Sequence, residues 1–153
     1  MGVRLRVNGA VKEVDAAADA VLLWVLRDDF GCSSAKYGCG LEQCGACRVL
    51  VDGMPVASCQ LAVGDVGDRE VTTLEGLRDT DAGRRVVDAL IARNAGQCAY
   101  CVPGIAVTLI ELASRGATVD RAALLRALDD HLCRCGSQPR ILRAAVDALG
   151  IDS

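Results

Sequence analysis

Three cysteines in the N-terminal half of the chain have a spacing that can bind iron. Cys39, Cys44 and Cys47 follow the pattern C-x4-C-x2-C within Gly-Cys-Gly-Leu-Glu-Gln-Cys-Gly-Ala-Cys. This spacing is typical of a loop that holds one 2Fe-2S cluster, with a fourth cysteine further along the chain. The interspersed glycines favour the same interpretation, because a backbone wrapped around a cluster brings amide groups close to sulfur and adopts φ values that a Cβ disfavours. The sequence therefore predicts an iron-sulfur site here.

A hairpin after this loop predicts the fourth ligand. Asp52-Gly53 is a dipeptide that closes a two-residue turn between two short apolar runs. With these residues as the turn, Cys47 pairs with the residue before Cys59. Cys59 then returns beside Cys47, within about 5 Å for directly opposed residues. Cys32 is the alternative ligand, although nothing in the pattern folds it back in the same way.

A second group of cysteines forms two close pairs in the C-terminal half. Its members are Cys98, Cys101, Cys133 and Cys135. Each pair precedes a predicted helix start, because Pro103 suits a first helical turn and Ser137 suits an N-cap. A cluster bound by thiolates is negative, and helix N-termini stabilise negative charge, so the pattern favours a second 2Fe-2S cluster. A structural zinc centre is the alternative, although zinc-binding cysteines are normally two to four residues apart and C-x-C is closer.

Three further residues near these motifs have simpler interpretations. Cys32 is predicted to be a small buried hydrophobic residue. His131, the only histidine, is predicted to be a helix-end residue. Arg134, which lies between two cysteines, either adjusts the charge of the second site or forms a surface or interface salt bridge.

Composition and charge exclude several classes of partner. The chain has 153 residues, nine cysteines and a net charge of −3. Phosphate binding requires clustered Lys and Arg, and no such patch occurs, so we expect no nucleic-acid partner. We expect no transmembrane segment, because the longest apolar run, residues 20–26, is too short to cross a bilayer.

The cysteines also indicate a compartment. No secretory signal pattern opens the chain, and a disulfide framework is therefore disfavoured. We expect a cytoplasmic location, or a periplasmic one only if a signal-bearing partner exports the chain.

Hydrophobic periodicity predicts an α+β fold in which the predicted secondary structure changes from strands to helices near residue 77. Alternating residues and turn dipeptides predict short strands in the first part, and helical spacing follows in the second. The expected strands are 3–7, 11–14, 48–51, 54–58 and 69–73, with a helix at 19–28 capped by Asp19, and later helices at 81–93, 103–115, 120–132 and 137–149. We expect two domains, residues 1–77 and 78–153, the first similar to the β-grasp arrangement of plant-type ferredoxins and the second a four-helix bundle.

Both cysteine patterns, their order and the intervening hairpin resemble the small iron-sulfur subunit of the molybdenum hydroxylases, the xanthine oxidase and aldehyde oxidoreductase family. The sequence of the first motif, Gly-Leu-Glu-Gln-Cys-Gly-Ala-Cys, is most similar to that of isoquinoline oxidoreductase and nicotinate dehydrogenase. The resemblance implies two 2Fe-2S clusters, one bound by the first three cysteines with Cys59 and one by the second group. It further implies that Gln97, in Gly-Gln-Cys, contacts the molybdopterin of a partner; a glutamine that braces the backbone is the alternative. No catalytic residue is expected in this chain.

The same resemblance implies the partners and the activity. A large subunit holds the molybdopterin, often as its cytosine dinucleotide, and converts an N-heterocycle, a purine or an aldehyde. Electrons leave through the second cluster and then the first, and pass to a cytochrome, to a FAD-binding medium subunit or to another acceptor. A free-standing ferredoxin-like carrier is the alternative.

Overall fold

Alternating apolar residues at the N-terminus form the first hairpin of a mixed sheet, as the sequence predicts. The computed structural model describes residues 2–116 and 118–151, in which β1 (Val3–Val7) pairs antiparallel with β2 (Ala10–Val14). Asn8 and Gly9 form the turn with φ of 50° and 79°. These left-handed values are what a two-residue hairpin turn requires, so the predicted Asn-Gly turn is confirmed.

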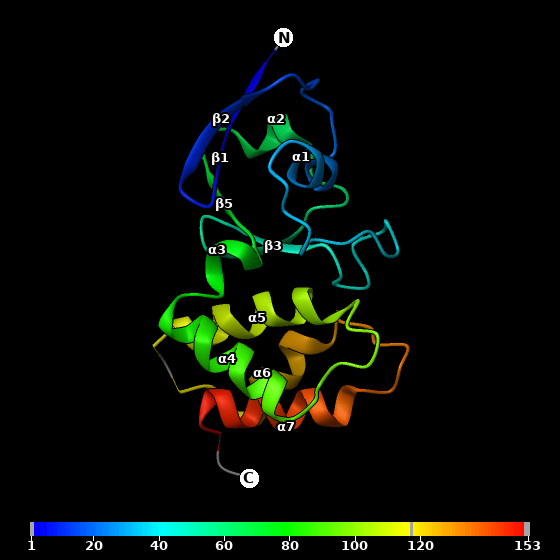
Figure 1. Cartoon of the computed structure of the whole chain (residues 1–153), viewed down its shortest axis with the longest axis vertical. Coiled ribbons are helices and arrows are strands. Elements are labelled where there is room, and N and C mark those ends of the chain that lie inside the picture. The colour runs from blue at the N-terminus through cyan, green and yellow to red at the C-terminus, as the bar shows by residue number, and fades with distance from the viewer. Residues whose placement is uncertain (1, 117, 152–153) are drawn as a thin grey trace.

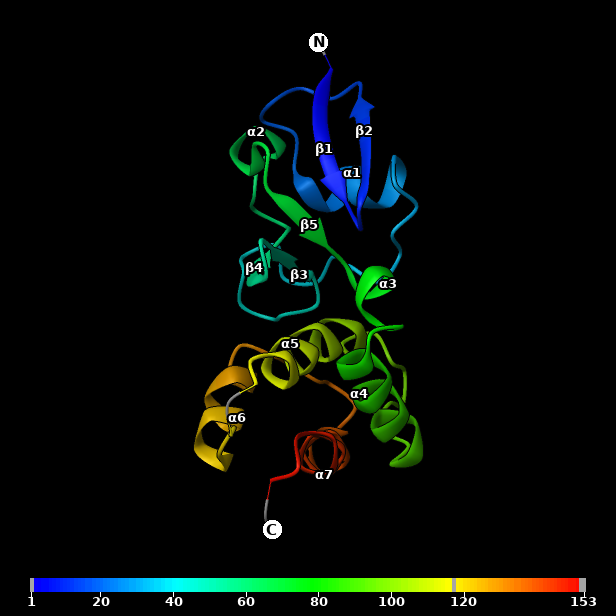
Figure 2. The same cartoon turned by 90° about the vertical axis from the view of Figure 1, so that its left-hand side faces the viewer.

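The remaining strands complete a sheet with the order β2-β1-β5-β3-β4. β5 pairs parallel with β1 and antiparallel with β3, which makes the sheet mixed. One helix, α1, crosses behind β1 and β2 in Figure 2, and its leucines belong to the core of this part of the chain. The elements are α1 (Leu22–Asp28), β3 (Arg48–Val51), β4 (Met54–Ala57), α2 (Val63–Val66) and β5 (Glu70–Thr72).

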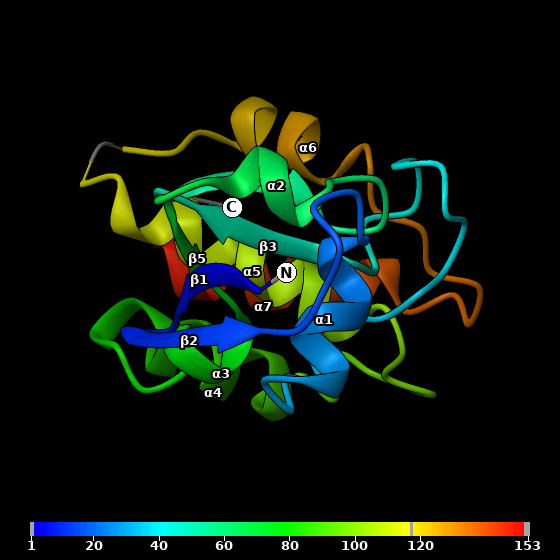
Figure 3. The same cartoon turned by 90° about the horizontal axis from the view of Figure 1, so that it is seen from above.

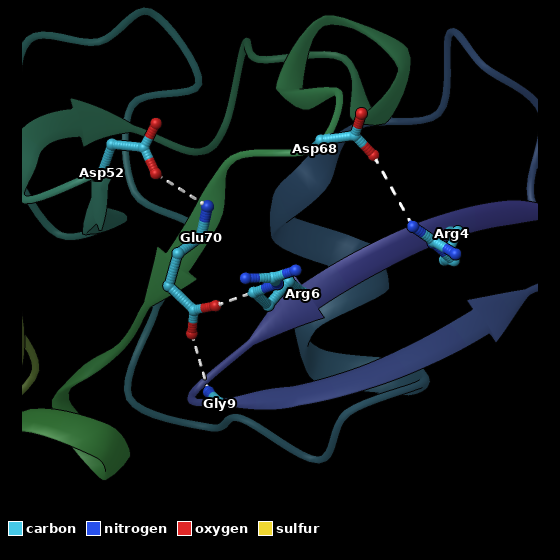
Figure 4. Close-up of polar contacts among 6 residues, drawn as sticks. All are labelled: Arg4, Arg6, Gly9, Asp52, Asp68 and Glu70. Carbon is cyan, nitrogen blue, oxygen red and sulfur yellow. Dashed lines mark hydrogen bonds and ion pairs between the residues drawn. The ribbon is translucent and has the colours of Figure 1, made fainter.

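Polar contacts of Glu70 connect the short strand β5 to both hairpins (Figure 4). The Glu70 carboxylate accepts a hydrogen bond of 2.7 Å from the Gly9 backbone N–H and lies 3.7 Å from the Arg6 guanidinium. The Asp52 carboxylate accepts a bond of 2.9 Å from the Glu70 N–H. These contacts link the two hairpins to the strand between them.

The prediction that Asp19 caps the first helix is wrong. The N-cap is Val21, and no side chain caps the helix. The first-turn N–H groups bond elsewhere: Leu22 N–H donates to the Leu61 carbonyl at 2.8 Å and Leu23 N–H to the Ser58 carbonyl at 3.1 Å. A neighbouring segment therefore satisfies the donors that a side-chain cap would have satisfied.

Helices form the rest of the described chain, below the sheet in Figures 1 and 2. They are α3 (Leu74–Leu77), α4 (Asp81–Ala92), α5 (Val102–Ser114), α6 (Arg121–Leu128) and α7 (Gln138–Leu149). We call β1–β5 with α1 and α2 the sheet unit, and α4–α7 the helical unit; α3 joins them. Within the helical unit, α5 is the helix that faces the sheet unit. It contacts β3 and β4 on one side and α4, α6 and α7 on the other.

Three features of this part differ from expectation. α2 and α3 have four residues each, too few to show a helical period, and were not predicted. α6 was predicted to reach residue 132 but ends at Leu128. It ends early because the next residues leave the helix to contact the first cysteine loop, where Leu132 N–H donates to the Cys44 carbonyl at 3.1 Å. The predicted role of His131 as a helix-end residue is therefore wrong.

Each unit has its own hydrophobic core. The first is centred on Leu5, Leu22, Leu26 and Val49, all at most 1% exposed. The second is centred on Val86, Leu109 and Ile110. The fold is α+β, as predicted. No helix within residues 2–116 and 118–151 is long and apolar enough to span a bilayer.

Candidate metal centres

The loop that joins α1 to β3 turns its backbone amides towards cysteine sulfur. Leu41 N–H and Gln43 N–H each lie 3.3 Å from Cys39 Sγ, and Cys39 N–H lies 3.3 Å from Cys44 Sγ. Amides directed at sulfur stabilise a thiolate, because hydrogen bonds to a charged form favour that form. The loop is thus built to hold sulfur as a negative ligand.

Glycines permit this wrapping, as the sequence predicts. Gly40 and Gly45 have φ of +66° and +73°, values that L side chains rarely adopt. At Gly38 the reason is space, since a Cβ there would come within 2.6 Å of Cys44 Sγ.

The hairpin brings Cys59 to this loop. β3 and β4 pair in the predicted register, with Val51 opposite Met54, and Ser58 N–H donates to the Cys47 carbonyl at 3.2 Å. The Cys59 thiol interacts with the side chains of Cys47 and Cys39. Cys32 lies elsewhere, in the core of the sheet unit, with its sulfur 3.7 Å from Asn8 Nδ2.

The thiols of this group differ in their tendency to ionise. Burial raises the pKa of Cys59 to about 11, and Cys47 beside it adds to the effect. At Cys39 burial opposes ionisation, but hydrogen bonds from the backbone N–H groups of Leu41 and Gln43 and from Cys44 together outweigh it and lower the pKa of Cys39 to about 7. Since metal ligands are thiolates, metal binding at this group would release protons.

The second group of cysteines is also brought together, from two loops of the helical unit. The side chains of Cys98 and Cys135 interact, and so do those of Cys101 and Cys133. Burial, followed by the hydrogen bond and charge of Cys133, raises the pKa of Cys101 to about 12. Cys98 is exposed at the surface, so this group has one buried and one open end.

Two helix N-termini adjoin the second group, as the sequence predicts. α5 begins directly after Cys101, which is its N-cap, and α7 begins three residues after Cys135. Proline occupies the first turn of both helices. Ser137 stands at the N-cap of α7 but makes no capping hydrogen bond there. The helix ends favour negative charge at this group of thiols.

Both groups fit a two-iron cluster better than a single ion. Zinc requires its four ligands at about 2.0–2.3 Å from one point. Within the described residues, no three His, Cys, Asp or Glu side chains are arranged to hold one metal ion. Each group supplies four thiols, the donor set that a 2Fe-2S cluster distributes over two irons. Neighbouring thiols interact as 39 with 44 and 47 with 59 in the first group, and as 98 with 135 and 101 with 133 in the second.

The two groups lie on the same side of the molecule. The loops at 31–47, 93–101 and 129–137 all occupy the right-hand side in Figures 1 and 3. Contacts between them include two hydrogen bonds: Leu132 N–H donates to the Cys44 carbonyl, and the Tyr100 hydroxyl donates to the Tyr37 carbonyl at 2.5 Å. The residues of these pairs are 88 and 63 positions apart in sequence, so the tertiary fold brings together distant motifs.

Other residues have mixed outcomes. Gln97 is exposed next to Cys98, and Arg134 is exposed between its cysteines. Sequence reasoning missed Glu75, whose carboxylate accepts bonds from Ser34 N–H at 2.8 Å and Ser34 Oγ at 2.5 Å. It also missed the burial of His131, whose Nε2 lies 2.9 Å from Thr108 Oγ1 on α5. Neither residue belongs to a recognisable motif, so no signal in the sequence could have found them.

Comparison with known proteins agrees with both sites. A family model described as a 2Fe-2S iron-sulfur cluster binding domain matches residues 5–77, and one described as a [2Fe-2S] binding domain matches residues 73–146. One subunit of the nicotinate dehydrogenase of Pseudomonas putida is 41% identical over 142 residues, which cover 93% of this chain and 90% of that protein. The alpha chain of isoquinoline 1-oxidoreductase from Brevundimonas diminuta is 37% identical, with 86% of each chain covered.

A solved structure shows the same fold within a longer chain. The aldehyde oxidoreductase of Desulfovibrio desulfuricans superposes with a TM-score of 0.88 and 32% identity. The match covers 97% of this chain but only 17% of the oxidoreductase chain.

Fold and sites together define a protein with two 2Fe-2S domains that serves an oxidoreductase. More specifically, the chain belongs to the family of small iron-sulfur subunits of the molybdenum hydroxylases. It is the electron-transfer subunit of an enzyme complex.

Proposed function

We propose that this chain carries electrons from the molybdopterin site of a large partner subunit to an external acceptor. One 2Fe-2S cluster is assigned to the loop group, Cys39, Cys44, Cys47 and Cys59, and the other to Cys98, Cys101, Cys133 and Cys135. The observation that carries the proposal is the pairwise meeting of thiols in both groups, beside backbone N–H groups or helix N-termini that favour negative charge.

The clusters supply the redox chemistry, and the protein supplies placement and electrostatics. The amides at Cys39 stabilise bound sulfur at the first site. The N-termini of α5 and α7 do so at the second. We assign the first cluster to a β-grasp ferredoxin-like domain, residues 1–77, and the second to a four-helix domain, residues 78–153.

The large partner is inferred from the relatives. Two of them are named as subunits of dehydrogenases or oxidoreductases. In the aldehyde oxidoreductase structure, the corresponding fold is only 17% of one chain, and we infer that a separate chain supplies the remainder here. We propose that this partner holds molybdopterin as its cytosine dinucleotide, that exposed Gln97 contacts it, and that the substrate is an N-heterocycle, a purine or an aldehyde.

The exposed end of the second group supports the proposed order of transfer. Cys98, the exposed cysteine of that group, lies beside Gln97, the proposed molybdopterin contact, so we place this group next to the molybdopterin. The first group faces the acceptor, which we propose to be a FAD-binding medium subunit or a cytochrome. Because free cysteines persist most readily in a reducing compartment, we propose a cytoplasmic location, or a periplasmic one only if a signal-bearing partner exports the chain.

Metal analysis of the purified complex tests the cluster assignment. We expect about four irons and four acid-labile sulfides per chain, with two distinguishable EPR signals after reduction. Cys98→Ser should remove one signal and Cys39→Ser the other. Zinc in place of iron, or loss of both signals in either variant, would contradict the assignment.

Affinity purification tests the partner. We expect a molybdenum-bearing large chain to co-purify with the tagged iron-sulfur chain in constant ratio. A tagged chain that holds both clusters but purifies alone would instead be a free-standing ferredoxin-like carrier. The neighbouring reading frames then identify the acceptor, since a flavin-domain chain and a haem-bearing chain imply different routes.

A further inference from the structure

His131 lies buried between the sheet unit and the helical unit. The residue is only 8% exposed, and its Nε2 lies 2.9 Å from Thr108 Oγ1 on α5. The opposite edge of the ring faces the first cysteine loop, since a Cβ built at Gly45 would come 2.2 Å from Nδ1. The imidazole therefore packs directly against the backbone of the residue that follows Cys44.

The backbone at Gly45 is confined from a second direction. A Cβ at Gly104, on α5, would come 2.1 Å from the Gly45 carbonyl oxygen. Gly45 itself has φ of +73°, which a larger residue would adopt only with strain. The first cysteine loop is thus in close contact with both α5 and the histidine.

The neighbours of His131 contact the same loop. Leu132 N–H donates to the Cys44 carbonyl at 3.1 Å, and the Asp130 carboxylate lies 3.7 Å from the Arg48 guanidinium. Three consecutive residues of the helical unit therefore touch residues 44–48 of the sheet unit. Cys133, a proposed ligand of the second cluster, follows immediately.

We propose that His131 is a positioning residue, which holds the first cysteine loop against the second and so fixes the separation of the two redox centres. This inference rests on the proposed function, because it requires a cluster at each site. The role is geometric: an electron moves from one centre to the other, and no bond or proton of His131 changes.

Packing makes this role specific. Interiors are close-packed, so a side chain enclosed on two sides sets the distance between the surfaces that it separates. Removing the imidazole leaves a cavity that the loops close only partly, and the distance between the loops changes. Val86 on α4 serves as the control, because its truncation leaves a cavity in the core of the helical unit and does not remove the imidazole between Thr108 and Gly45.

The experiment compares His131→Ala, His131→Gln and the control Val86→Ala in the purified complex. Two readouts are used: the spin–spin interaction between the reduced clusters by EPR, and hydrogen exchange at the Leu132 amide. We expect His131→Ala to change the spin–spin interaction and to accelerate Leu132 exchange about tenfold, equivalent to about 1.4 kcal/mol. His131→Gln, which keeps a polar group for Thr108, should largely restore both, and Val86→Ala should change neither while lowering the melting temperature.

The experiment distinguishes failure of the positioning role from failure of the proposed function. Unchanged spin–spin interaction and exchange in iron-replete His131→Ala would overturn the inference, as would equal changes in Val86→Ala. Absence of two clusters from the unmodified complex would overturn the proposed function instead. Should His131→Ala fail to assemble, His131→Asn decides, because it keeps a polar group but no longer fills the space between Thr108 and Gly45. A change in the same two readouts supports the inference, and no change overturns it.

Discussion

A methyl group added at Gly104 should force the two units apart. The Cβ of Gly104→Ala would lie 2.1 Å from the Gly45 carbonyl oxygen, whereas an ordinary carbon–oxygen contact is about 3.3 Å. The difference requires a shift of about 1.2 Å between α5 and the first cysteine loop. Because the obstructing atom belongs to the backbone, no rotation of a flexible side chain can relieve the clash.

The energetic effect is the balance of two terms. Overpacking a well-packed interior costs typically about 1–3 kcal/mol. Alanine in a helix is favoured over glycine by about 0.5–1 kcal/mol, which offsets part of this cost. We therefore expect a net loss of about 1–2 kcal/mol, measured by urea unfolding of the complex, together with faster exchange of the Leu132 amide.

Gly83→Ala is the matched control. This glycine is also helical, and its added Cβ would come 2.0 Å from the Leu77 carbonyl oxygen, but it lies on α4 where α3 ends. It should lose stability by a similar amount without changing Leu132 exchange. Full stability and unchanged Leu132 exchange in Gly104→Ala would refute the close approach of α5 to Gly45. Equal acceleration of Leu132 exchange in Gly104→Ala and Gly83→Ala would show that the effect is not specific to this contact.

Two other predictions test the sheet unit and its junction with α3. Cys32→Ala should retain about four irons per chain, whereas Cys59→Ser should lose one cluster. Loss of iron in Cys32→Ala with full iron in Cys59→Ser would identify Cys32 as the fourth ligand instead. Glu75→Gln should lower stability by about 1–2 kcal/mol at pH 7, because the carboxylate accepts charge-assisted bonds. Burial opposes ionisation of Glu75, but hydrogen bonds from Ser34 and Thr73 outweigh it and hold its pKa below the ordinary 4.5. The carboxylate therefore stabilises the fold above about pH 4.5, and the difference between wild type and Glu75→Gln should shrink as pH falls through the folded-state pKa; a constant difference in unfolding measurements down to pH 3 would contradict this.

Local patterns were read correctly where the cause of the structure is local. Asn8-Gly9 and Asp52-Gly53 adopt left-handed turn conformations, so the register of both hairpins followed from sequence. Asp19 failed as a cap because the donors at the start of α1 are satisfied by carbonyl groups of residues 58–61, a contact that local reasoning does not contain. The end of α6 was missed for the same reason, since Cys44 is distant in sequence from Leu132.

Sequence by itself determined the chemistry: thiol spacing, glycine placement and proline-led helices specify which sulfurs can gather and what charge their surroundings favour. These are properties of short segments, and short segments adopt them through backbone geometry and nearest-neighbour bonding. Only the tertiary structure decided how the two cysteine groups lie relative to each other, because Gly104 and His131 pack closely against Gly45. That arrangement depends on the close packing of segments that are far apart along the chain, and no pattern within either segment encodes it.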